Sequence, residues 1–176
     1  MWRCKVIHMK YKKGKGGAED FPEEESAIRL MEAPPMELGI TGIVGQFIGA
    51  RPKTGAGALI RTVLAGLPFG ELLRLRELLG LPLDQLAEKL NISRATLHRR
   101  KHAGRLDEGE SDRVVRYARL VGKAADVFGG VEAAREWLQF PQFGLGNIAP
   151  LDYARTEVGA REVENLLGRI DHGVYS

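Results

Sequence analysis

The chain has few of the residues from which disulfides, metal sites and many active sites are built. Its 176 residues include one cysteine, Cys4, so an internal disulfide is excluded. The four histidines are scattered: His8, His98, His102 and His172. Two of them, His98 and His102, share a helix face, but arginine follows the first where a zinc protease has glutamate. We therefore predict no metal site and no cofactor.

The signatures of two common enzyme classes are also missing. Ser93 and Ser111 lack the Gly-x-Ser-x-Gly turn of a hydrolase nucleophile and have no evident triad partners. The glycine-rich stretch 49–57 lacks the Gly-Lys-Ser/Thr of a nucleotide-binding loop, and no strand-like run precedes it. The sequence therefore predicts a protein without catalytic residues that is not an enzyme.

Long apolar runs are absent as well. The N-terminus lacks the apolar core of a signal peptide, and no segment approaches the roughly 20 apolar residues that span a bilayer. We expect a cytoplasmic protein without a membrane partner. The net charge is only +3, so the case for a polyanionic partner depends on where the charges lie.

Residues 83–100 carry the pattern of a helix-turn-helix. The apolar positions recur at helical spacing: Leu83, Leu86, Ala87, Leu90, Ile92 and Leu97. The small side chain of Ala87 lets two helices cross closely. Asn91 stands where the turn needs a left-handed backbone. Ser93 is the expected N-cap of a second helix that starts at Arg94.

The second helix is strongly basic, with no acidic residue between Glu88 and Asp107. The residues predicted to contact DNA are Ser93, Arg94, Thr96, Arg99, Arg100, Lys101 and Arg105. In a major groove, the N-terminal members of this set could reach base edges, and the last three would contact phosphates. Arg100 stands where many such motifs bury an aliphatic side chain, so this helix is expected either to end its packing early or to sit at another angle.

Helical periodicity continues on both sides of this motif. Before the motif it predicts helices from Ala58 to Gly66 and over 69–79. After the motif it predicts a long helix from Asp107 or Glu108 to Phe128 and shorter helices over 131–138 and about 159–171. One or two further helical turns are predicted within 151–156. No strand alternation is present, so the fold class is all-α. We divide the chain into an irregular N-terminal arm (1–55), a helix-turn-helix domain (56–128) and a small helical domain (129–176).

Short motifs flank the helix-turn-helix in a specific order. They are Gly66-Leu67-Pro68, Glu110-Ser111-Asp112-Arg113, Trp137-Leu138, Pro150-Leu151, Leu167-Gly168-Arg169-Ile170 and Gly173-Val174. Together with the basic helix they resemble the Xre/MbcA/ParS-type antitoxins of bacterial type II toxin–antitoxin systems. The resemblance covers about residues 59–176. The Gly-Gly pair of the family after the Trp-Leu helix is here Leu145-Gly146-Asn147.

The resemblance implies an Xre-like DNA-binding domain followed by a toxin-binding domain. The toxin in such systems is commonly a RES-domain enzyme that degrades NAD, and the antitoxin covers its active site. The complex represses its own operon, so operator DNA is a second partner, and a homodimer within the toxin–antitoxin complex is expected. By analogy the toxin contact is expected on the last helix and tail, at Arg169, Asp171, His172, Val174, Tyr175 and Ser176.

Two other functions fit the same residues. The chain could be a stand-alone helix-turn-helix transcription regulator that its C-terminal helices dimerise. It could also be an interaction adaptor with a vestigial helix-turn-helix. The genes beside it separate the first alternative from an antitoxin, and a salt-titrated DNA-binding assay separates the adaptor from both.

Overall fold

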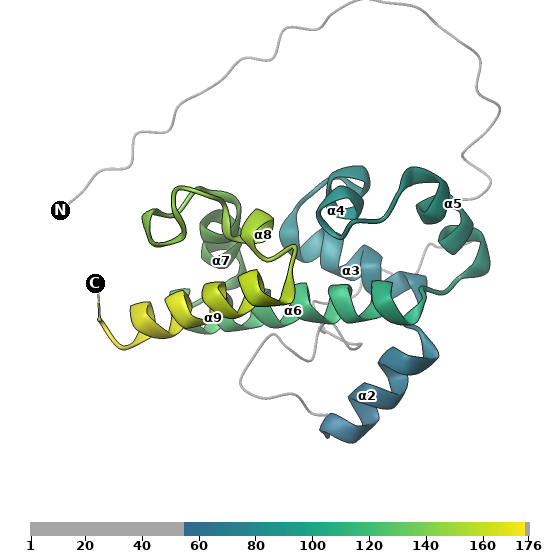
Figure 1. Cartoon of the computed structure of the whole chain (residues 1–176), viewed down its shortest axis with the longest axis horizontal. Coiled ribbons are helices and arrows are strands. Elements are labelled where there is room, and N and C mark those ends of the chain that lie inside the picture. Colours follow the sequence, from purple (N-terminus) through teal and green to yellow (C-terminus); the bar gives the residue numbers. More distant parts are fainter. Residues whose placement is uncertain (1–54, 175–176) are drawn as a thin grey trace, which may run out of the picture. The chain divides into compact units, whose positions relative to one another are not determined.

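The computed structural model describes residues 55–174, which are helical and contain no strand (Figure 1). The helices are α2 (Ala56–Ala65), α3 (Phe69–Leu79), α4 (Leu83–Lys89), α5 (Arg94–Ala103), α6 (Glu108–Phe128), α7 (Val131–Gln139), the 3-10 turn η2 (Phe143–Leu145), α8 (Pro150–Tyr153) and α9 (Glu157–Asp171). The all-α prediction is confirmed. The predicted arm up to residue 54, and Tyr175 and Ser176, lie outside the described residues.

The long helix α6 lies at the centre of this arrangement. It contacts α2 and α3, and also α7 and α9, and Figure 1 shows α9 running alongside it. Val114, Ala118, Val121 and Ala125 recur at helical spacing along α6 and form a buried apolar stripe. The helix-turn-helix and the C-terminal helices therefore share one hydrophobic core within residues 55–174.

Local capping chemistry sets the ends of the main helices. Asp107 caps α6, and Glu110 completes a capping box by accepting the Asp107 N–H at 2.8 Å. The predicted starts of α5 and α6 are thereby confirmed. The last helix begins at Glu157, earlier than the predicted Gly159, because the Thr156 hydroxyl accepts the Gly159 N–H at 3.0 Å and acts as the N-cap.

The Gly66-Leu67-Pro68 turn joins the start of α3 to the connection between α5 and α6. Leu67 is buried; its N–H donates to Ser111 Oγ at 2.8 Å, and its carbonyl accepts the Leu106 N–H at 2.8 Å. Gly66 has a φ of +82°, and a Cβ there would lie 2.2 Å from the Leu106 carbonyl oxygen. This turn therefore needs glycine, and it is bonded to the connection between α5 and α6.

Candidate functional site

The turn between α4 and α5 has the geometry that the sequence predicts. Asn91 has a φ of 53°, in the left-handed region. The Ile92 N–H donates to the Ala87 carbonyl at 2.8 Å, which closes the end of α4. Ser93 Oγ accepts the Thr96 N–H at 3.2 Å, so the predicted N-cap is confirmed. The turn thus presents the start of α5 in a defined orientation.

Leu97 is the one buried residue of α5 and points to the core. The opposite, outer face of the helix is cationic. Arg94, His98, Arg99, Lys101 and His102 are exposed. The Arg94 side chain is 87% exposed and pairs with the edge of α4, where Nη2 lies 3.3 Å from Asp84 Oδ2. Among the described residues, no acidic side chain pairs with Arg99 or Lys101. Most of the predicted DNA-contact set is thus presented together on one helix.

Arg100 differs from the other cations of α5 because it is bound inside the chain. Its Nε donates to Glu110 Oε2 at 2.8 Å and its Nη2 to Asp107 Oδ2 at 2.6 Å. The Arg100 side chain is 21% exposed and the Glu110 side chain 4% exposed. An arginine is tolerated at this usually aliphatic position because a buried carboxylate neutralises it. The end of α5 is thereby joined to the start of α6 through ion pairs.

Arg105, the last member of the predicted set, is also engaged within the chain. Its Nε donates to the Gly66 carbonyl at 2.9 Å, so it holds the turn before α3. Sequence reasoning missed all three internal partners of these two arginines: Gly66, Asp107 and Glu110. The capping box at Asp107 was a usable signal for Glu110, since it directs that carboxylate toward the end of α5.

Asp107 gives the junction of α5 and α6 a dependence on pH. The hydrogen bond from the Glu110 N–H, followed by the charge of Arg100, lowers the pKa of Asp107 below its usual range. A lowered pKa means that the charged carboxylate stabilises the fold above the ordinary aspartate pKa of about 3.9. That contribution is lost as the pH falls through the lower folded value.

Replacing Asp107 by alanine should therefore lower the free energy of unfolding by about 1 kcal/mol at pH 7, the usual worth of an N-cap. The deficit relative to wild type should shrink as the pH falls below the ordinary aspartate pKa. Urea unfolding at several pH values measures it. Asp126, exposed near the end of the same helix, is the control, and alanine there should have little effect. A deficit for Asp107→Ala that stays constant down to acid pH would contradict the assignment.

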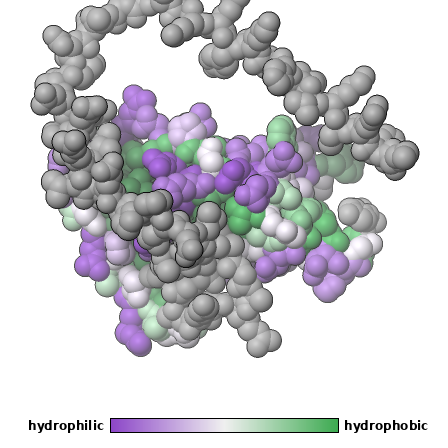
Figure 2. All heavy atoms as spheres, turned by 180° about the vertical axis from the view of Figure 1, so that it is seen from behind, coloured by the Kyte–Doolittle hydropathy of each residue, from purple (hydrophilic) through white to green (hydrophobic). Residues whose placement is uncertain are grey.

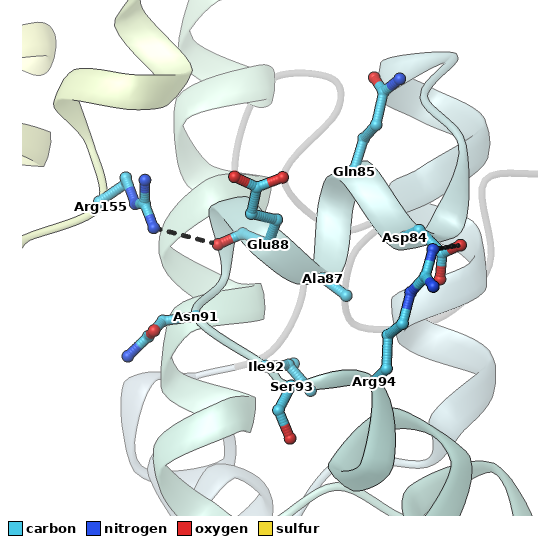
Figure 3. Close-up of a pocket in the computed structure, with 9 residues that line it drawn as sticks. All are labelled: Asp84, Gln85, Ala87, Glu88, Asn91, Ile92, Ser93, Arg94 and Arg155. Atoms are coloured by element: carbon cyan, nitrogen blue, oxygen red, sulfur yellow. Dashed lines mark hydrogen bonds and ion pairs between the residues drawn. The ribbon is translucent and has the colours of Figure 1, made fainter.

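Two arginines, Arg94 and Arg155, line a hollow beside the start of α5, and Arg155 comes from a distant part of the sequence. α4, the turn and Arg94 line most of it, and Arg155 comes from the connection between α8 and α9 (Figure 3). The Arg155 Nη2 lies 3.4 Å from the Glu88 carbonyl oxygen. Arg155 could not be predicted as part of this hollow, because nothing in its local sequence pattern places it beside the helix-turn-helix.

Polar contacts hold this connection to the end of α4. Lys89 Nζ lies 2.6 Å from Asp152 Oδ1. The buried Tyr117 hydroxyl of α6 lies 2.7 Å from the Leu151 carbonyl oxygen and 3.1 Å from that of Lys89. Burial raises the pKa of the Tyr117 phenol, so it stays a neutral donor. The helix-turn-helix and the C-terminal helices are thus connected at their polar edges as well as through the core.

The end of α9 presents the described part of the predicted tail surface. The inner face of α9 is buried at Ala160, Val163 and Leu167. The predicted contact residues Arg169, Asp171, His172 and Val174 are exposed. Four of the six tail residues are therefore available to a partner, and the other two lie outside the described residues.

Two further kinds of site are not found in the part of the chain that the structure describes. Residues 55–174 contain no cluster of three or more histidine, cysteine or acidic side chains able to hold a metal ion. None of the helices in that range has both the length and the apolar character of a membrane span. The cationic face of α5 and the exposed C-terminal surface are thus the two candidate interfaces.

Comparison with known proteins identifies both parts. Residues 58–119 match the antitoxin Xre-like helix-turn-helix domain, and residues 123–173 match the antitoxin Xre/MbcA/ParS C-terminal toxin-binding domain. The chain is 39% identical over 113 residues to "Antitoxin Xre" of Yersinia enterocolitica, across 64% of this chain and 68% of that protein. It is 40% identical over 74 residues to "Antitoxin Xre" of Photorhabdus laumondii, across 42% of this chain and 50% of that protein. The chain therefore belongs to the Xre family of antitoxins.

Proposed function

We propose that this antitoxin binds and neutralises a toxin encoded beside it, and represses the operon that encodes both. The observation that supports both activities is the shared core: an exposed cationic α5 and the helices matched to a toxin-binding domain are built around the same α6. The resemblance to RES–Xre systems supports a RES-domain toxin that degrades NAD. The end of α9 and the tail would cover its active site.

Co-expression with the neighbouring toxin gene tests the toxin half of the proposal. The chain should restore growth, co-purify with the toxin and preserve cellular NAD. If the chain does not bind the protein encoded beside it, the antitoxin activity is refuted, whether or not the chain binds DNA. If the chain neutralises a toxin that, acting alone, does not lower cellular NAD, only the RES assignment is refuted.

For the DNA half, we assign direct contact to Arg94, Arg99 and Lys101, whose side chains are exposed. Ser93 is the N-cap of the same helix, and Thr96 lies in its first turn. Thr96 is therefore close enough to the N-terminus of α5 to contact a base. Arg100 and Arg105, already bound within the chain, would act mainly by holding α5 in place. A homodimer would read two half-sites about one helical turn apart, so the operator should be palindromic.

Replacing Arg94 by alanine should weaken operator binding by about 1 to 3 kcal/mol and relax specificity at one base position. Its exposed pair with Asp84 contributes little, so Arg94 is free to move to a guanine edge. Electrophoretic mobility shifts on operator and random DNA measure the change. Lys101→Ala is the matched control, since a phosphate contact should weaken both DNAs alike and reduce the salt slope by about 1. Equal losses on both DNAs for Arg94→Ala would contradict a base-reading role.

A further inference from the structure

The connection between α7 and α8 exposes apolar side chains that the DNA half of the proposed function does not use. Phe143 is 90% exposed, Phe140 64% and Ile148 45%. Phe143 has the largest exposed fraction among the large hydrophobic residues described as exposed. Apolar side chains reach the surface elsewhere too, as the green atoms among the purple ones in Figure 2 show. At this connection, however, two aromatic rings occur within four residues of one another.

The backbone of this loop is held by its own hydrogen bonds. The Gln142 N–H donates to the Ile148 carbonyl at 3.2 Å, and the Asn147 N–H donates to the Gln142 carbonyl at 3.0 Å. The Gln142 side-chain amide donates to the carbonyls of Trp137 at 3.0 Å and Phe140 at 2.9 Å. Gly146 and Asn147 both have positive φ, 67° and 61°. Asparagine replaces the second family glycine there because it tolerates the left-handed region.

The loop is also fixed to the core and to α9. Leu145, the last residue of η2, is only 4% exposed. Gly144 lies against α9 so closely that a Cβ would be 2.9 Å from Leu166 Cδ1. The aromatic side chains are therefore presented by a backbone of defined conformation that packs on the helix whose end carries the tail residues. A rigid aromatic side chain loses little conformational entropy on binding, which favours affinity.

We propose that Phe143, together with the exposed Phe140 and Ile148 of the same connection, is the apolar anchor of the toxin contact and inserts into an apolar pocket on the toxin surface. This inference rests on the proposed antitoxin activity and adds a second region to its tail. The toxin is the occupant because all three residues lie within the segment matched to a toxin-binding domain, 123–173. The loop is also continuous with α9 through the contact of Gly144 with Leu166.

The test is a titration of the full-length chain with the purified toxin encoded beside it. Phe143→Ala should weaken toxin binding about 30-fold, the effect of losing one aromatic hot-spot residue. Phe143→Leu, which keeps part of the apolar surface, should lose less. Because Phe143 is 90% exposed, neither change should alter the melting temperature or operator binding. Ile60→Ala on α2, where the side chain is 57% exposed and outside the toxin-binding match, should bind the toxin like wild type.

The outcomes separate this inference from the proposed function. If wild type and Phe143→Ala bind the toxin equally well, the anchor role of Phe143 is refuted and the proposed antitoxin activity stands. Wild type that binds no toxin overturns both. If Phe143→Ala changes the mass of the free chain in light scattering but not its toxin affinity, the loop contacts a second copy of this chain, and the anchor is again refuted.

Discussion

Replacing Gly159 by alanine should lower the free energy of unfolding by about 3 kcal/mol or more, because the site has no room for a methyl group. A Cβ at this position would lie 1.8 Å from the Tyr153 carbonyl oxygen and 2.9 Å from its carbon. Both atoms belong to the backbone, so no side chain can rotate away. The connection between α8 and α9 would have to move, and the contacts of Asp152 and Arg155 with α4 would move with it.

Gly168, in the same helix, supplies the matched control. A Cβ there would meet nothing within 4 Å, and alanine is favoured over glycine inside a helix by about 1 kcal/mol. Gly168→Ala should therefore stabilise the protein slightly while Gly159→Ala destabilises it. Urea unfolding followed by circular dichroism measures both. If the two variants shift the urea midpoint of unfolding in the same direction, the predicted steric conflict between residue 159 and the Tyr153 carbonyl is refuted.

The boundaries of α5 and α6 could be predicted from the sequence because local chemistry sets them, whereas the Thr156 cap of α9 was missed. Ser93 at the start of α5, Asp107 at the start of α6 and Gly129 after it act on neighbours within four residues. The turn residue Asn91 is local in the same sense. Such interactions are visible in a single sequence, since the partners are separated by a fixed and short spacing.

What surrounds each helix could not be predicted in the same way. Periodicity identified the apolar stripe of α6 but not that helices from both predicted domains cover it. The prediction counted Arg100 with the DNA-contact cations, whereas its partner Glu110 lies in the next helix. Arg155 reaches the helix-turn-helix across 67 residues of sequence. Contacts of this kind depend on how helices dock, and a pattern of residue types within one segment carries no information about docking.

The division of function between residues 56–128 and 129–176 remains a prediction, and the structure sharpens how to test it. α9 ends in two bonds that close the helix: the Gly173 N–H donates to the Ile170 carbonyl at 3.0 Å, and the Val174 N–H to the Arg169 carbonyl at 2.9 Å. With Gly173 at a φ of 67°, this is a Schellman cap. Removing residues 173–176 would therefore fray α9 as well as shorten the tail.

A chain that ends at Val174 avoids this ambiguity. It keeps the cap and lacks only Tyr175 and Ser176, the outermost residues of the predicted toxin contact. We expect it to lose neutralisation completely while its helicity and operator binding match wild type. If the Phe143 loop supplies much of the affinity, the shortened chain should still co-purify with the toxin and yet leave its active site open. Growth rescue, pull-down and circular dichroism on the same variant separate these effects. A chain ending at Val174 that still protects cells would show that the active site is covered by another surface.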